Sequence, residues 1–350
     1  MNQEYALGVW RQQPAQKGFD VEVGAGITEQ EFEAYVDAVS RYRSLTERNT
    51  YQVLQRNYIR LASMLEMYTN LEKIGGTFRT VDKRSVSVLF MGEMTNWLAS
   101  TRLYLESERD FIVRQFGEGS DELRGFKGAT SRAAKTYLGY RFLYDLRDYA
   151  QHCGPPVSGM NVSRDSAGNR LVEMYLDRSE LLTARFKWNS YAKKLLATWP
   201  ERISIMPLVE EAMKGFRLIE DEVLRILIRR CGAAVAKMRE GIARIGGREG
   251  HKAVFKLPSP AGEEQFAWQT FPEPSALDLI EDALTTDDPL AKLPKQAIDA
   301  SAWSPPQTHA NSQAVAVMAA ALEHGNGSEF TECVNRVIHS SRPIGELIRW

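Results

Sequence analysis

Three side chains near the middle of the chain combine a guanidinium, a carboxylate and an imidazole. Arg147, Asp148 and His152 lie in the segment YRFLYDLRDYAQHCGPP, which ends in two prolines. An imidazole titrates near neutral pH and can accept or donate a proton. A guanidinium can bind a phosphate through two parallel hydrogen bonds and stabilise the charge that develops on it. Together these groups suit attack of an RNA 2′-hydroxyl on the neighbouring phosphate, a reaction that requires no metal ion.

The segment predicts a helix, from about residue 131 to residue 153, with these side chains away from its core face. The apolar stripe of this helix consists of Leu138, Phe142, Leu146, Tyr149 and Cys153. At 100° per residue, Arg147 and His152 lie roughly 140° apart and flank the opposite arc. Asp148 and His152 are one turn apart, close enough to pair. The Gly-Pro-Pro that follows caps the helix and prevents it from continuing.

The same helix carries a second stripe that is aromatic and basic. Tyr140, Tyr144, Arg147 and Gln151 form it. A helix with a core face and a second adhesive face usually has a second partner, so we take Tyr144 and Gln151 as candidate substrate-binding residues. We also expect the tyrosine face to form a two-fold interface between copies. In the structural alternative, His152 caps the last carbonyls of its helix and Arg147 forms a surface ion pair.

Long helical patterns flank this segment and predict an all-α bundle with small β-hairpin insertions. The stretch TEQE, Thr28 to Glu31, has the spacing of a capping box and begins the first pattern. A second helix ends near residue 116, a hairpin is expected over residues 161–177, and a long helix runs from about 206 to 245. We divide the chain into an irregular lead-in with a short strand at FDVEV (1–27), the bundle (28–246) and a small C-terminal module of unknown role (247–350), which begins with a second expected hairpin about Pro258–Gly262.

Composition places the chain among ordinary soluble proteins. Of its 350 residues, 43% are hydrophobic and 25% are charged, and the net charge of -1 argues against nonspecific polyanion binding. The three cysteines form no C-x-x-C pair, which favours a reducing compartment. The sequence shows neither a secretory signal nor a long apolar run, so we expect a cytoplasmic protein that does not enter a membrane.

Common cofactor motifs are incomplete or missing. Gly24 and Gly26 imitate the start of a dinucleotide fingerprint, but Glu29 occupies the position of its third glycine. The sequence contains no phosphate-binding loop, no H-E-x-x-H and no G-x-S-x-G elbow. We therefore expect neither a cofactor nor a catalytic metal.

The segment YRFLYDLRDYAQHCGPPVS resembles the R-x4-6-H motif of the HEPN superfamily, in which the residue after the arginine is commonly Asn, His or Asp. The upstream stretch NWLASTRLYLESERDFIVRQFG, Asn96 to Gly117, resembles the preceding helix of bacterial HEPN-like proteins. The resemblance covers residues 96 to 158. It implies a helical bundle, frequent dimerisation, and often metal-independent RNA cleavage in toxin–antitoxin or antiviral systems.

By this resemblance Arg147 would hold phosphate, His152 would act as acid or base, and Asp148 would orient the motif. Some sites of the family add a polar residue from a neighbouring helix, and the candidates here are Glu93, Asn96 and Glu106, with Asn96 also a candidate for substrate binding. RNA, a second copy of the chain and a regulatory or antitoxin protein are the expected partners. Two alternatives remain open: a non-catalytic helical interaction protein and a nucleotide-sensing protein.

Overall fold

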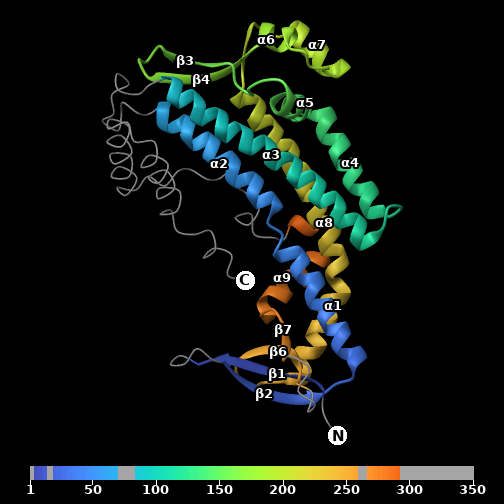
Figure 1. The fold of residues 1–350 in the computed structure, drawn as a ribbon. Helices are drawn as coiled ribbons and strands as arrows, with labels where there is room; N and C mark the ends of the chain where they lie inside the picture. Colours follow the sequence, from blue (N-terminus) through green and yellow to red (C-terminus); the bar gives the residue numbers. More distant parts are fainter. Residues whose placement is uncertain (1–3, 14–18, 70–82, 259–265, 292–350) are drawn as a thin grey trace. The chain divides into compact units, whose positions relative to one another are not determined.

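A computed structural model describes residues 4–13, 19–69, 83–258 and 266–291, and these form two compact units (Figure 1). The sheet unit contains the described residues up to Arg48 and those from Val223 onward. The helical unit contains those from Asn49 to Glu222. Helix α8 (Met206–Ile245) contributes residues to both units.

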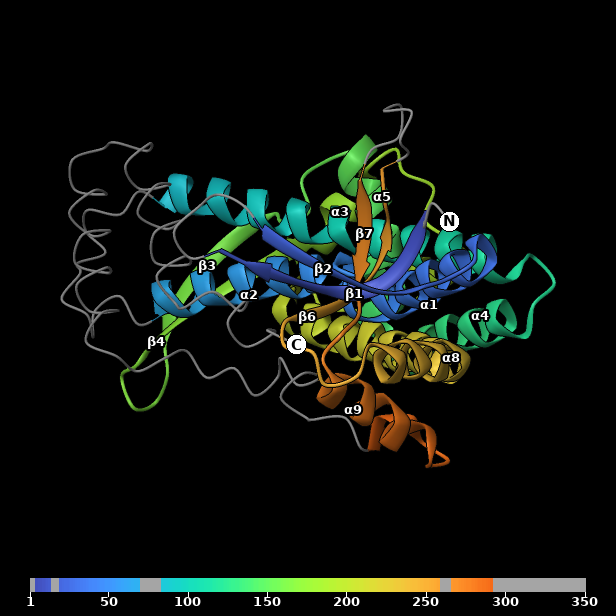
Figure 2. The same ribbon diagram turned by 90° about the horizontal axis from the view of Figure 1, so that it is seen from below.

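The sheet unit is built on a four-stranded antiparallel sheet whose strand order is β2-β1-β6-β7 (Figure 2). The strands are β1 (Tyr5–Gln12), β2 (Phe19–Gly26), β6 (His251–Lys256) and β7 (Ala267–Thr270). Three helical segments accompany it: α1 (Glu29–Thr46), α9 (Pro274–Leu284) and the 3-10 turn η2 (Pro289–Ala291). One face of β1 presents Leu7 and Val9 to a core that includes Tyr35 of α1 and Met238 of α8.

The sheet revises our expectation for both ends of the chain. The short strand expected over Phe19–Val23 is confirmed as part of β2, and the second expected hairpin is confirmed as β6 and β7, whereas β1 lies in a stretch that was expected to be irregular. Strand β1 pairs with β6 along six positions, from Tyr5 opposite Lys256 to Trp10 opposite His251. This pairing joins the expected lead-in to the start of the expected C-terminal module, because the backbone N–H and C=O groups of a central strand need hydrogen-bond partners on both of its edges. Residues 292–350 of that module lie outside the described residues.

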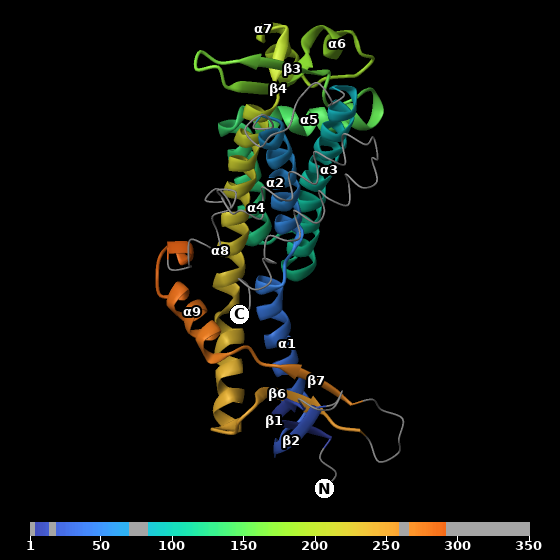
Figure 3. The ribbon, with the colours of Figure 1, turned by 90° about the vertical axis from the view of Figure 1, so that its left-hand side faces the viewer.

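The helical unit contains most of the helices. They are α2 (Thr50–Thr69), α3 (Lys83–Phe116), α4 (Asp121–Thr136), α5 (Leu138–His152), α6 (Arg178–Thr183), α7 (Ser190–Thr198) and the first part of α8. A three-stranded antiparallel sheet, of order β3-β4-β5, lies at the same end of the unit as α5, α6 and α7 (Figure 3). Its strands are β3 (Gly159–Arg164), β4 (Arg170–Asp177) and β5 (Arg202–Ser204).

The fold is mostly helical with two small antiparallel sheets, so the all-α prediction is wrong in that respect. The hairpin expected over residues 161–177 is confirmed as β3 and β4, which turn between Asp165 and Asn169. Strand β5 was not predicted because its three residues are too short to show alternation. No described helix is long and apolar enough to cross a membrane.

Local signals for helix ends are confirmed at several places. Thr28 and Glu31 form the predicted capping box at the start of α1. The helix expected from residue 131 to 153 is instead split at Tyr137, whose backbone is extended. The apolar spacing in the sequence continues across Tyr137, so it gives no sign that the chain changes direction there.

Candidate active site

Helix α5, which carries the candidate motif, is fixed at its start by α8. Its N-cap residue, Tyr137, makes no side-chain capping bond. The carboxylate of Glu211 takes that role, since it accepts from the backbone N–H of Leu138 at 3.1 Å and of Gly139 at 2.8 Å. A negative charge at a helix N-terminus is favourable because the first N–H groups lack helical partners.

Close packing reinforces this attachment of α5 to α8. A Cβ atom added to Gly139 would lie 2.2 Å from the backbone oxygen of Leu208, so only glycine permits the approach. The next residue, Tyr140, is buried with its ring centroid 4.9 Å from that of Phe216. Trp97 and Tyr104 of α3 pack against the same phenylalanine ring. These contacts set the direction of α5 relative to α3.

Arg147 is more covered than the helical pattern predicts. Its side chain is only 14% exposed, and Nη1 donates to Oδ1 of Asp148 at 2.7 Å. Its Nε atom is buried and meets no hydrogen-bond partner in the described chain. Our expectation that Arg147 points away from the packed interior is therefore wrong, because the second face of α5 also packs within this unit.

A second arginine, Arg102 of α3, approaches the same carboxylate. Its Nη1 lies 3.8 Å from Oδ1 of Asp148. It also pairs with Glu106 one turn along α3, and this hydrogen bond raises the pKa of Arg102. Arg102, Glu106, Arg147 and Asp148 thus alternate in charge and form what we call the ionic cluster.

His152 is the last residue of α5 and is exposed. The described residues make no ion pair or hydrogen bond to its ring, so the pairing expected with Asp148 is not formed. The end of the helix is closed by backbone bonds, in which the N–H groups of Cys153 and Gly154 donate to the carbonyl of Tyr149. His152 therefore presents its imidazole to solvent one turn beyond Asp148.

The remaining candidates divide between the ionic cluster and the opposite side of α3. Glu106 belongs to the cluster. Glu93 instead pairs with Arg60 of α2 at 2.9 Å, and the backbone carbonyl of Asn96 accepts from Asn57 of α2 at 3.4 Å. Of the three residues proposed to complete the site, only Glu106 is joined to the motif by these contacts.

The predicted aromatic stripe is also divided. Tyr144 is 52% exposed and Gln151 is exposed, as expected for substrate contact. Tyr140 is buried against Phe216, so of the two tyrosines only Tyr144 is exposed to solvent. The spacing of four places Tyr140 and Tyr144 on one side of α5, but Tyr140 lies at the end where α8 crosses.

Sequence reasoning missed Arg102 and Glu211. Arg102 lies within the stretch that carries the family resemblance, and its spacing of four from Glu106 is visible in the sequence. Its approach to Asp148 is a tertiary contact without a local signal. Among the residues that the structure covers, no group of three or more His, Cys, Asp or Glu side chains could hold a metal ion. No protein family, curated protein or solved structure matches the chain significantly.

Proposed function

We propose that the chain is an endoribonuclease of the HEPN type that acts at the end of α5. The proposal is supported chiefly by one observation: the guanidinium groups of Arg102 and Arg147 share the carboxylate of Asp148, one helical turn from an exposed imidazole. Positive charge for a phosphate and a proton acceptor therefore lie on one surface of the helical unit. A homodimer and a regulatory or antitoxin partner remain further parts of this proposal.

The two arginines have different roles in this scheme. The Arg102 side chain is 42% exposed and can turn to a phosphate, because its competing ion pairs with Glu106 and Asp148 are exposed and weak. Arg147 is largely covered. It therefore holds Asp148 in place and adds positive charge on the buried side of the ionic cluster. A guanidinium can bind a phosphate with two parallel hydrogen bonds.

The proposed reaction is an attack by the RNA itself. The 2′-oxygen forms a bond to the adjacent phosphorus, and its proton passes to the imidazole of His152. The bond from phosphorus to the 5′-oxygen breaks, that oxygen takes a proton from water, and His152 returns its proton to the hydroxide that is left. The products carry a 2′,3′-cyclic phosphate and a 5′-hydroxyl.

The test uses purified protein and single-stranded RNA, with and without a chelator of divalent ions. We expect cleavage in both conditions, with the two end groups named above. His152→Ala should slow cleavage by about 100-fold or more. His251→Ala is the matched control, because His251 is an exposed histidine in the sheet unit. Equal cleavage of DNA, or a strict need for a divalent ion, would refute this mechanism.

Exposed apolar side chains favour the second candidate, a non-catalytic interaction protein. Leu103 and Tyr144 are each about half exposed, on the helices that carry Arg102 and Asp148. Large exposed apolar side chains beside charged ones are typical of interfaces. Wild-type protein that binds a protein partner through this surface, leaves RNA intact and loses the partner in Leu103→Glu would favour this alternative.

A further inference from the structure

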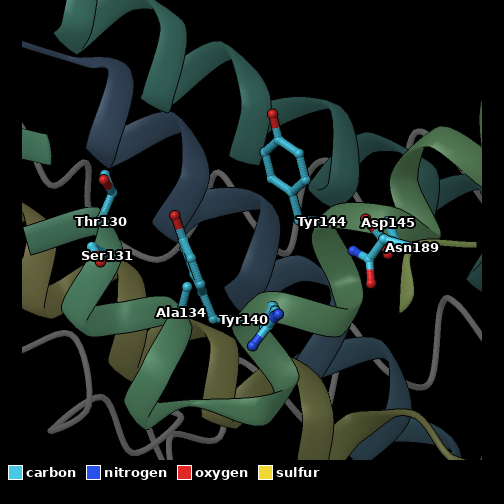
Figure 4. Close-up of a pocket in the computed structure, with 8 residues that line it drawn as sticks. Thr130, Ser131, Ala134, Tyr140, Tyr144, Asp145 and Asn189 are labelled. Atoms are coloured by element: carbon cyan, nitrogen blue, oxygen red, sulfur yellow. The ribbon is translucent and has the colours of Figure 1, made fainter. Parts of the chain in front are cut away.

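A pocket lies where α4, α5 and the start of α7 meet within the helical unit (Figure 4). Its volume is about 280 Å³. Thr130, Ser131 and Ala134 of α4 lie on one side of it, and Asp145 and Asn189 lie together on the other. Tyr140, Arg141 and Tyr144 of α5 complete the lining. Sites for drug-sized ligands usually measure about 300–1,000 Å³, so this pocket suits a single small ring system.

An unsatisfied carboxylate oxygen belongs to this lining. Oδ2 of Asp145 is buried and has no hydrogen-bond partner among the described residues. Burial raises the pKa of Asp145, and neighbouring Asn189 offsets part of this shift. An ionised carboxylate accepts hydrogen bonds only, so a ligand pairs with Asp145 by presenting N–H or O–H groups once the carboxylate turns from its buried position toward the pocket. Buried polar atoms without partners are rare and call for such an explanation.

Hydrogen-bond donors and a flat aromatic wall accompany the carboxylate. The guanidinium carbon of Arg141 lies 3.5 Å above the ring centroid of Tyr191, which fixes its plane and leaves its edge N–H groups to donate. Ser131 adds a hydroxyl that can donate or accept. The half-exposed ring of Tyr144 offers a surface on which a planar ligand can stack. A ligand for this pocket is therefore flat, with both donors and acceptors on its edge.

We infer that the pocket binds a nucleobase, and that it prefers guanine. The Watson–Crick edge of guanine offers two neighbouring N–H donors for the Asp145 carboxylate and a carbonyl oxygen for the donors of Arg141 or Ser131. Unstacked RNA bases are typically recognised by stacking on an aromatic side chain together with hydrogen bonds to this edge. The base belongs either to an RNA strand or to a free guanine nucleotide.

The RNA version of this inference rests on the proposed function and specifies its substrate. Tyr144 precedes Asp148 by one helical turn on α5, a rise of about 6 Å. Tyr144 also lies close enough to Arg102 to influence the pKa of that guanidinium. The pocket therefore adjoins the ionic cluster, and a strand whose phosphate meets Arg102 can place a neighbouring guanine against Tyr144. Cleavage would then occur beside guanine in single-stranded RNA.

The experiment measures binding separately from cleavage. Short oligonucleotides carry a single G, A, C or U beside a 2′-deoxy nucleotide that cannot be cut, and guanosine monophosphate is tested alone. We expect the G oligonucleotide to bind most tightly. Tyr144→Ala should weaken its binding about 10-fold, from the loss of base stacking. Asp145→Asn should remove the preference for G, because an amide cannot accept from both donors.

Two variants serve as matched controls, and circular dichroism verifies that every variant is folded. Leu171→Ala removes an exposed apolar side chain outside the pocket, and Asp110→Asn neutralises an exposed aspartate. Both should bind all oligonucleotides as the wild type does. If Asp145→Asn does not fold, Ser131→Ala replaces it and should weaken binding of the G oligonucleotide more than of the A oligonucleotide.

The outcomes separate this inference from the proposed function. RNA cleaved equally beside every base, with Tyr144→Ala unchanged, overturns the inference and leaves the ribonuclease standing. Intact RNA, together with binding of guanosine monophosphate that Tyr144→Ala abolishes, supports the pocket as a nucleotide site and overturns the ribonuclease. If Tyr144→Ala dissociates an oligomer into smaller species and still binds the base, Tyr144 lies in an interface between copies. That result overturns the inference.

Discussion

The strongest stability prediction concerns the coupling between Arg147 and Asp148. We consider Arg147→Ala, Asp148→Ala and the double variant. In Asp148→Ala, the Arg147 side chain, which is only 14% exposed, loses the carboxylate that lies 2.7 Å from its guanidinium. Breaking a fully buried pair costs about 3–5 kcal/mol, whereas a solvent-exposed pair contributes about 0–1 kcal/mol. Because Asp148 is 41% exposed, the coupling energy of this pair should lie between these values, at about 1–2 kcal/mol.

The single variants should differ from each other. Asp148→Ala should lower the free energy of unfolding by about 1–2 kcal/mol, since it removes a hydrogen bond to a charged group. Arg147→Ala should cost more, about 2–3 kcal/mol, because it also removes the covered aliphatic part of the side chain. The double variant should cost less than the sum of the two. A loss of this size in Arg147→Ala would agree with its covered side chain and contradict the sequence-based expectation that it lies away from the core face.

Urea unfolding followed by circular dichroism measures these free energies. The chain offers a matched control in Arg109 and Asp110, another adjacent Arg-Asp pair, on α3 of the same unit. Their ion pair is 3.2 Å long and the side chains are 46% and 57% exposed. Its coupling energy should be below about 0.5 kcal/mol. Equal coupling energies in the two cycles would refute the reasoning, since the covered pair should couple more strongly than the exposed one.

Three further predictions concern packing and pH. Gly139→Ala should destabilise the protein by about 2 kcal/mol or more, because its Cβ would meet backbone atoms of Leu208. Gly92→Ala, whose Cβ would meet no described atom within 4 Å, should stabilise α3 by about 0.5–1 kcal/mol, and the opposite order in urea unfolding would contradict the packing. Tyr140→Ala should cost about 3–5 kcal/mol, since Tyr140 is a buried aromatic, while Tyr144→Ala should cost less than about 1 kcal/mol. Similar losses in both tyrosine variants would show that the burial of α5 is misassigned. Glu31 has its pKa lowered to about 2 by the backbone hydrogen bond from Thr28 and by Arg244. Its stabilising effect is therefore present above the ordinary value near 4.5 and is lost as the pH falls through about 2. The difference in melting temperature between wild type and Glu31→Gln should accordingly close on acidification, and a difference that does not change with pH would exclude this origin.

Local patterns in the sequence were sufficient for most helices and for several of their ends. The capping box at Thr28 and the Gly-Pro-Pro after His152 each act within one turn, so their effect is readable without a fold. The hairpin of β3 and β4 was similarly readable, because its turn residues are contiguous. The position of His152 on the surface at the end of α5 also agrees with its spacing from the core stripe.

The tertiary structure alone decided which side chains surround the motif. Burial of Tyr140 depends on Phe216 of α8, a helix whose approach to α5 is set by Gly139 and by the carboxylate of Glu211. Helical spacing assigns a residue to one side of its own helix and carries no information about how many neighbouring helices cover that side. The approach of Arg102 to Asp148 joins residues 46 positions apart along the chain. The pairing of β1 with β6 likewise joins segments that are distant in sequence, because cross-strand pairs form wherever the fold brings two edges together.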